Sequence, residues 1–248
     1  MDEDNLKNKD GVRDMFEQIA PRYDLLNRLL SFGIDRGWRK KLSRMLVAQL
    51  LGRSRTKANR VLDVATGTAD LIVAIEKEAT KKRLENREYT GIDITQGMVE
   101  IGREKLKKRG LSAELKVADA MNLPFGDDRF AAVSCAFGVR NFPDARRGVS
   151  EMYRVLCSGG GVYILEYSPS EVKGLWGAIF RFYFKRVLPT IGGWVSGSKA
   201  AYEYLPASVD DFLSANEFKE VLRSEGFTDV EVRQLMGGVV TLYSAIKN

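Results

Sequence analysis

The chain alternates between two spacings of apolar residues from Arg60 onward. Short runs rich in β-branched residues predict five strands, at 60–64, 88–93, 113–118, 130–136 and 161–167. Between these runs, apolar residues at helical spacing predict helices at 70–84, 96–109 and 144–156. Alternating strands and helices are typical of βαβ units, so we expect a parallel sheet with helical crossovers.

The segment 96–109 illustrates the helical pattern. Met98, Val99 and Leu106 fall on one stripe, and charged residues occupy the rest of the surface. Thr95 precedes this segment and is a suitable N-cap residue.

The pattern changes after residue 200. A helix is predicted near 215–225 and is ended by Gly226. Two strand-like runs follow, at 228–235 and 239–246, separated by Met236–Gly238. We expect them to form a hairpin that closes an otherwise parallel sheet of seven strands.

Two segments do not fit the alternation. Residues 11–51 are helix-like and precede the first strand, with Phe16 and Tyr23 at helical spacing, so they can form a cap over a ligand. Residues 171–206 are rich in aromatics and glycines. Excursions of this kind line ligand crevices in open α/β sheets, so we expect this insertion to lie on the substrate side.

Composition limits the chemistry that the chain can perform. Its 248 residues, 44% hydrophobic and 29% charged, suit one α/β domain. With no histidine, histidine triads and histidine-ligated metals are excluded, and Cys135 and Cys157 lack metal-like spacing, so we expect no metal. Any proton transfer must use another side chain, water or the substrate.

Charge and hydropathy bear on partners and location. Lys and Arg number 39 against 33 acids, a net charge of +6, and basic runs occur at 81–83 and 105–109. We interpret these runs as solvated helix faces, with weak attraction to anionic membranes or nucleic acid as the alternative. The acidic start is unlike a targeting signal, and no apolar run reaches about 18 residues, so we expect a cytoplasmic protein, soluble or peripheral to a membrane.

Three predicted strands end at or near a carboxylate: Asp63, Asp93 and Asp119. The loop 61–70 after the first strand has Gly67 at its centre, but alanines where a dinucleotide-binding turn carries its outer glycines. Asp70 stands where the next helix begins and would repel a pyrophosphate. A cofactor with cationic groups and no phosphate fits better, and S-adenosylmethionine has an ammonium and a sulfonium.

Each acid has a candidate role in holding S-adenosylmethionine. We expect Asp63 or Asp70 to receive the ammonium while N–H groups of the loop around Gly67 receive the carboxylate. Asp93 would accept the ribose hydroxyls, and Asp119 the adenine amine. A single acid at a strand end is commonly only a surface cap. The hypothesis therefore rests on the recurrence of an acid at the ends of three successive strands.

Longer motifs resemble a known family. The motifs are Phe16–Asn27, Leu30–Ile34, Phe137-Gly-Val-Arg140-Asn141, Glu151–Leu156, Val187–Gly192, Tyr202–Pro206 and Gly237–Val239. They resemble the signatures of the methyltransferases of ubiquinone and menaquinone biosynthesis, and the likeness covers nearly the whole chain. The resemblance implies methyl transfer from S-adenosylmethionine to a ring carbon of a polyprenylated quinol. It also implies that Thr68, Asp93 and the pair Asp119-Ala120 bind the cofactor.

The chain departs from the family pattern at a few places. Ala136 stands where many members have a serine that contacts the cofactor. Cys157-Ser-Gly-Gly160 replaces a Lys-Pro-Gly-Gly turn, and Tyr243 replaces a common histidine. None of these changes argues strongly against activity.

The expected organisation is a single doubly wound, mostly parallel seven-stranded α/β domain of the class I S-adenosylmethionine-dependent methyltransferase type. Its parts are a helical cap at 1–55, a cofactor-binding core at 56–170, the substrate-side insertion at 171–206, and the C-terminal helix and hairpin at 207–248.

Carbon methylation requires an electron-rich ring, so the site should stabilise a phenolate. We expect Arg140 to hold the developing phenolate, with Asn141 and Tyr23 as further catalytic candidates and water or a carboxylate as proton acceptor. Arg140 can instead tie its turn to a backbone carbonyl, and Tyr23 can be an ordinary core aromatic.

The favoured acceptor is demethylmenaquinol. Alternatives are a benzoquinol, another phenolic or lipid acceptor, a nucleic-acid-modifying or nucleic-acid-binding protein, or a catalytically silent binding module. No Asn-Pro-Pro-Tyr-like motif supports a nucleic-acid partner, and we expect none. The aromatic segment 175–188 suits a peripheral membrane contact, or else a buried helix or homodimer face.

Overall fold

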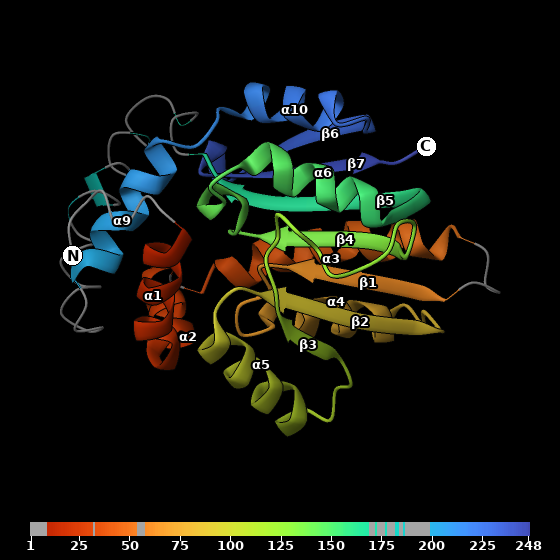
Figure 1. Cartoon of the computed structure of the whole chain (residues 1–248), viewed down its shortest axis with the longest axis horizontal. Coiled ribbons are helices and arrows are strands. Elements are labelled where there is room, and N and C mark those ends of the chain that lie inside the picture. The colour runs from red at the N-terminus through yellow and green to blue at the C-terminus, as the bar shows by residue number, and fades with distance from the viewer. Residues whose placement is uncertain are drawn as a thin grey trace.

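The computed structural model describes residues 9–31, 33–53, 58–168 and 199–248, and five single positions between 168 and 199. A seven-stranded sheet with helices on both faces forms the body of the molecule (Figure 1). The strands are β1 (Asn59–Val64), β2 (Arg87–Asp93), β3 (Glu114–Val117), β4 (Phe130–Ala136), β5 (Leu156–Tyr167), β6 (Thr228–Leu235) and β7 (Val240–Ile246).

The strand order is β3-β2-β1-β4-β5-β7-β6. The first five strands pair in parallel, while β7 pairs antiparallel with both β5 and β6. The predicted α/β sheet and its closing hairpin are therefore confirmed. In this order the chain reverses direction across the sheet between β1 and β4, the place where open α/β sheets bind ligands.

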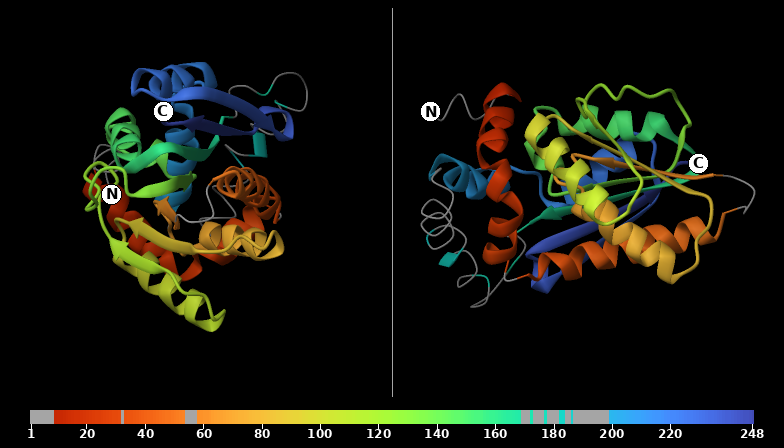
Figure 2. Two further views of the ribbon diagram at one scale, coloured as in Figure 1. Left: turned by 90° about the vertical axis from the view of Figure 1, so that its right-hand side faces the viewer. Right: turned by 90° about the horizontal axis from the view of Figure 1, so that it is seen from below.

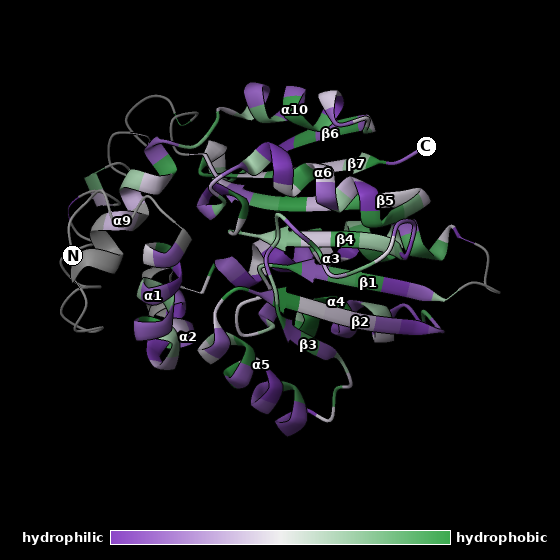
Figure 3. Cartoon of the chain, viewed as in Figure 1, coloured by the Kyte–Doolittle hydropathy of each residue, from purple (hydrophilic) through white to green (hydrophobic). Residues whose placement is uncertain are grey.

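Two apolar layers sandwich the sheet. Helices α3 (Asp35–Leu51), α4 (Asp70–Lys81) and α5 (Gln96–Lys108) pack on one face. Helices α6 (Ala145–Val155) and α10 (Ala215–Ser224) pack on the other (Figure 2). Six of the seven residues of β4 are buried, as expected for a central strand covered on both faces. Figure 3 shows the corresponding band of hydrophobic residues through β4.

The start of one strand differs from the prediction, and one predicted N-cap residue is confirmed without a capping bond. Strand β5 begins at Leu156 and not at 161, because Gly159 adopts a left-handed conformation (φ +70°) and the β4–β5 pairing shifts register there. Thr95 is the N-cap residue of α5 but makes no side-chain capping bond. The side chain of Asp93 accepts the Thr95 N–H instead, at 2.9 Å.

The N-terminal helices divide into two groups. Helix α1 (Lys9–Ile19) and α2 (Tyr23–Leu30), joined by a 3₁₀ turn, lie at the carboxyl edge of the sheet, where α9 (Lys199–Asp210) neighbours α1 (Figure 1). Helix α3 packs along the sheet against α4. In the described residues, the predicted cap thus consists of α1 and α2, because the apolar stripe of α3 is buried in the central core.

Most of the predicted insertion at 171–206, with the aromatic segment 175–188, lies outside the described residues. No helix in the described part of the chain is long and apolar enough to cross a membrane.

Candidate active site

A pocket opens at the carboxyl edge of the sheet, between the ends of β1, β2 and β4 and the cap helices. It contains about 750 Å³ of empty volume, part of it open to solvent. Six of the nine residues predicted for the site line it: Tyr23, Gly67, Asp93, Asp119, Ala120 and Asn141. Asp63, Thr68 and Arg140 are not part of its lining.

Asp93 is the best-fixed polar group of the pocket. One carboxylate oxygen accepts the N–H of Gly67 at 2.8 Å, and the other accepts the N–H of Thr95 at 2.9 Å. Burial raises the pKa of Asp93, and these backbone N–H groups oppose the rise. The carboxylate therefore joins the loop after β1 to the start of α5 and keeps further lone pairs for a ligand that donates hydrogen bonds.

The loop after β1 holds an unusual backbone. Ala65 (φ +53°), Gly67 (φ +53°) and Ala69 (φ +65°) are all left-handed. For the two alanines this conformation costs about 1 kcal/mol each, so tertiary contacts must hold the loop. A Cβ added at Gly67 would lie 3.8 Å from the Tyr23 ring, so the cap packs directly on the loop.

Asp63 lies beneath this loop and not in the pocket. Thr66 Oγ1 donates to one of its oxygens and Ser134 Oγ to the other, both at 2.7 Å. Burial raises the pKa of Asp63 to about 6, although the two hydroxyls partly offset the rise. These contacts give Asp63 an internal role, tying β1 and its loop to β4.

Thr68 and Asp70 face Lys105 of α5. The Lys105 ammonium contacts Thr68 Oγ1 at 2.7 Å, Asp70 Oδ1 at 2.6 Å and Asp24 Oδ2 at 2.5 Å. Thr68 Oγ1 in turn donates to Asp24 Oδ1 at 2.6 Å. Burial alone would raise the pKa of Asp70, but the positive charges of Lys105, Arg39 and Arg28 together outweigh it and hold the pKa below its ordinary value. The carboxylate that suggested a cationic cofactor thus already has a cation from the protein.

Lys105 departs from the prediction for its basic run. The other basic residues of that run are exposed, as predicted, whereas Lys105 is largely buried. Lys105 follows Met98 by seven residues and so lies beside the apolar stripe of α5, unlike Lys107 and Lys108, and this spacing was the available signal.

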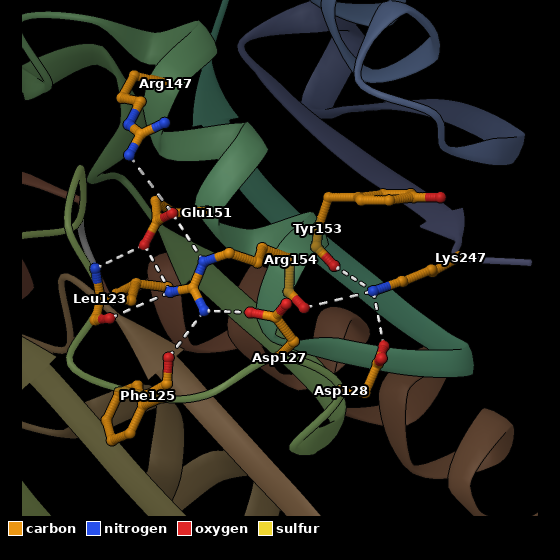
Figure 4. A network of polar contacts seen from close by, with 9 residues as sticks. All are labelled: Leu123, Phe125, Asp127, Asp128, Arg147, Glu151, Tyr153, Arg154 and Lys247. Atoms are coloured by element: carbon orange, nitrogen blue, oxygen red, sulfur yellow. Dashed lines mark hydrogen bonds and ion pairs between the residues drawn. The ribbon is translucent and has the colours of Figure 1, made fainter.

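The segment after β3 carries Asp119, which accepts the N–H of Met121 at 2.9 Å. Helix α6 fixes the continuation of this segment (Figure 4). Glu151 accepts the N–H of Leu123 at 2.8 Å, and Arg154 donates to the carbonyls of Leu123 and Phe125 at 3.1 and 2.8 Å. Two residues of the Glu151–Leu156 motif therefore support the loop that brings Asp119 to the pocket.

The segment after β4 is held differently. Phe137 is left-handed (φ +60°) and its carbonyl accepts from Arg140 Nη1 at 2.6 Å. The same nitrogen donates to Glu166 Oε1 at 2.7 Å, and the Arg140 N–H points to Glu166 Oε2 at 3.3 Å. The contact with a backbone carbonyl, foreseen as the alternative role of Arg140, is present. Asn141 lines the pocket and accepts from the Tyr204 hydroxyl at 3.1 Å.

Tyr23 extends from the start of α2 into the pocket wall. Its ring meets Phe16 edge to face at 6.1 Å, and its hydroxyl is hydrogen-bonded to Asn27. Burial raises the pKa of Tyr23. The phenol is therefore neutral near pH 7 and can donate a hydrogen bond, but it is not a ready base.

Trp38, Arg39 and Tyr167 lie near the site and escaped the sequence analysis. Trp38, Phe137 and Tyr167 form an aromatic cluster with ring centroids 4.6–6.2 Å apart. The Arg39 guanidinium lies over Phe137 and that of Arg140 over Tyr167. One signal was available for a further neighbour, because Glu166 is an acid near the end of a strand, like Asp63 and Asp93.

Within the described ranges, no group of three or more cysteine and carboxylate side chains is arranged to hold a metal ion.

The parallel sheet with a closing hairpin, and the pocket at the ends of β1, β2 and β4, define the class I S-adenosylmethionine-dependent methyltransferase fold. A crystal structure of an S-adenosylmethionine-dependent methyltransferase from Aquifex aeolicus superposes with a TM-score of 0.56 at 19% identity, covering 77% of this chain and 84% of that one.

The sequence comparisons narrow the class to a family. The model of the ubiE/COQ5 methyltransferase family matches residues 3–247, and the chain belongs to this family. It is 44% identical to a demethylmenaquinone methyltransferase of Deinococcus radiodurans, over 94% of this chain and 91% of that protein. It is 42% identical to a ubiquinone/menaquinone biosynthesis C-methyltransferase of Geobacter sulfurreducens, over 95% and 88%.

Proposed function

We propose that this enzyme transfers a methyl group from S-adenosylmethionine to a ring carbon of a polyprenylated quinol, with demethylmenaquinol as the favoured acceptor. Relatives that bear the names of such enzymes match nearly the whole chain. The observation that carries the proposal is that one pocket joins two sets of residues: Asp93 and Asp119 at strand ends, and Tyr23 and Asn141 from the two signature segments.

The strand-end residues suit the cofactor. Asp93, held by two backbone N–H groups, presents a fixed carboxylate for the ribose diol, and Asp119 lies in the pocket lining, where we place the adenine amine. Ile94 and Met121 supply apolar surface for the adenine ring. Because Thr68 and Asp63 face other protein groups, we assign them to shaping the loop around Gly67.

The signature segments suit the acceptor. The bound cofactor supplies an electrophilic methyl group. The acceptor carbon becomes nucleophilic only as its neighbouring hydroxyl gives up or shares a proton, so groups that stabilise negative oxygen promote attack. We assign the neutral phenol of Tyr23, which lines the pocket, and Arg140, which lies outside the lining but directly precedes the lining residue Asn141, as donors for that oxygen. Asn141 can orient the ring. Helix α1 contributes the apolar side chains of Val12 and Phe16 to the lining, which we propose limit the access of water to the reacting atoms.

The decisive test is methyl incorporation from labelled S-adenosylmethionine into purified acceptors. We expect demethylmenaquinol to be methylated, a benzoquinol without the ring methyl to react more slowly, and RNA not to react. Faster labelling of the benzoquinol would show that the benzoquinol, and not demethylmenaquinol, is the preferred acceptor. Labelling of RNA alone would reject a quinol enzyme.

A second test uses cells that lack the protein. Accumulation of demethylmenaquinone, measured by mass spectrometry of extracted quinones, would support the proposal. An unchanged quinone profile would reject it.

We further propose a cytoplasmic enzyme that touches the membrane peripherally, since a polyprenyl tail partitions into lipid. Phe182 within the insertion is 65% exposed, and Leu25 on α2 is 62% exposed. Flotation with anionic liposomes should recover the protein, and a Leu25→Ser, Phe182→Ser double variant should float less. The expected homodimer stays a prediction, which light scattering of the purified enzyme would test.

A further inference from the structure

Arg140 and Glu166 form an ion pair that is almost fully removed from water. The side chain of Arg140 is 6% exposed and that of Glu166 is 0% exposed. Glu166 Oε1 accepts from Arg140 Nη1 at 2.7 Å and from the Tyr167 N–H at 2.9 Å, while Oε2 faces the Arg140 N–H at 3.3 Å. The carboxylate therefore contacts both the guanidinium and the backbone of the same arginine, which fixes the direction of the guanidinium plane.

Both hydrogen bonds that the Arg140 side chain makes come from Nη1. Arg140 Nε is buried and has no hydrogen-bond partner. Leaving a buried donor unsatisfied is unfavourable, and more so when the group is charged, so such a donor calls for an explanation. Arg140 directly precedes the pocket-lining Asn141, and it acts electrostatically on Tyr23, another residue of the lining. An oxygen of a bound acceptor would satisfy this donor.

The electrostatic surroundings make Glu166 the dominant negative charge on Arg140. Among the described residues, the other ionisable groups that interact with the pair are Tyr23, Cys135, Tyr167 and Tyr204, all neutral near pH 7. Arg39 acts on the same two tyrosines, Tyr23 and Tyr167, but it has its own carboxylate partner in Asp35. The pair of Arg140 and Glu166 is therefore close to neutral as a unit, and a lone guanidinium there would stabilise an anion more strongly.

We propose that Glu166 is a positioning residue for the methyl transfer: it orients Arg140 so that Nε is free for the acceptor oxygen, and its charge sets how strongly Arg140 favours the ionised acceptor. The inference rests on the proposed quinol methylation and deepens it. The negative charge of Glu166 weakens the stabilisation of the phenolate by Arg140, but its contacts hold the guanidinium in one orientation.

Two substitutions separate charge from geometry. Glu166→Gln keeps the length of the side chain and removes the charge, whereas Glu166→Asp keeps the charge and shortens the reach. Glu231→Gln, which breaks an exposed pair with Arg233 on β6, is the matched control. For each purified full-length variant, we would measure kcat for demethylmenaquinol against pH, the KM for the quinol, the Kd for S-adenosylmethionine, and the melting temperature.

The expected results differ between the variants. Glu166→Gln should move the acidic limb of the kcat profile to lower pH by about 1 unit, because an unneutralised Arg140 stabilises the phenolate more, and it should lower kcat about 10-fold because Arg140 is less fixed. Glu166→Asp should lower kcat about 10-fold or more without moving that limb. The cofactor Kd should stay within about two-fold in both variants, and the control should match the parent.

Other outcomes overturn the inference. It fails if Glu166→Gln leaves both kcat and the pH profile unchanged, or if both variants lose cofactor affinity in proportion to activity. If Glu166→Gln does not fold, Glu166→Asp decides: an unchanged kcat overturns the inference, and a lower kcat with intact cofactor binding supports it. A parent enzyme that methylates no quinol overturns the proposed function and this inference together, whereas an active parent with unaffected variants overturns the inference alone.

Discussion

Two segments bring side chains to the same pocket, and they are held in place by different means. The segment after β3, which carries Asp119, is fixed by α6 through a chain of contacts from Glu151, Arg154 and the C-terminal Lys247 (Figure 4). Arg154 is 32% exposed and has several acceptors. The segment after β4, which carries Asn141, depends chiefly on one buried pair, Arg140 with Glu166.

This difference predicts unequal tolerance to mutation. A partly exposed network spreads its energy over many contacts, and water can replace a lost partner. A buried pair has no such substitute, and removing one partner leaves a charge in a dry environment. The cofactor side of the pocket should therefore tolerate single changes that the acceptor side does not.

The largest effect is expected from Arg140→Ala. Losing the donor for the phenolate should lower kcat by about 10²- to 10⁴-fold, while the Kd for S-adenosylmethionine, measured by calorimetry, stays within about two-fold. Arg140→Met combined with Glu166→Gln controls for the carboxylate left unpaired. Unchanged turnover with intact cofactor binding would show that Arg140 takes no part in the reaction.

The next effect concerns Asp63, which links β1 beneath the cofactor loop to β4. Its pKa rises from 3.8 to about 6 on folding, so the native state binds an extra proton between these values and stability must fall as pH rises through this window. Between pH 4 and pH 7 the loss is about 2 kcal/mol. Asp63→Asn should abolish this part of the loss in denaturant unfolding without cofactor. An identical loss in parent and variant would contradict the internal role.

A smaller effect is expected from Asp93→Asn. Weakening charge-assisted hydrogen bonds to the ribose should raise the Kd for S-adenosylmethionine about 10- to 100-fold, with kcat at saturating cofactor nearly unchanged. Asp70→Asn is the comparison, because Asp70 faces Lys105 and should change this Kd by less than about three-fold. A larger effect at Asp70 than at Asp93 would support the role predicted for Asp70 from the sequence, which is to receive the ammonium of the cofactor.

The smallest effect is expected from Arg154→Met. Losing several shared contacts should raise the Kd for S-adenosylmethionine only about three- to ten-fold, equivalent to roughly 1 kcal/mol. The kcat should not change. Glu151→Gln in the same background shows whether the two side chains act as one unit, since coupled residues give a non-additive double variant. A loss of kcat as large as at Arg140 would remove the contrast between the two segments.

The sequence was sufficient for the architecture because buried strands must be apolar and helices must be amphipathic. The hairpin followed from two strand-like runs around Met236–Gly238. The early start of β5 could not be foreseen, since Gly159 gives a signal for a turn even when it forms a bulge within a strand. Where the hydrophobic pattern was strong, only element ends were misplaced.

The site was less predictable, because strand-end acids have the same sequence signal whatever they face. Asp93 lines the pocket, whereas Asp63 is hydrogen-bonded to Thr66 and Ser134. Ser134 lies on β4, 71 residues away from Asp63 along the chain. Asp70 meets Lys105 for the same reason. Such partners are decided by how helices and strands pack in three dimensions.

The ion cluster around Lys105 has a kinetic consequence. Asp24 is adjacent to Tyr23 on α2, so α2 cannot move away from the pocket without separating Asp24 from Lys105. These side chains are 26% and 13% exposed, so dissolved salt can reach and weaken their attraction. The residence time of a ligand beneath α2 should therefore shorten as ionic strength rises, although no charge on that ligand needs to be involved.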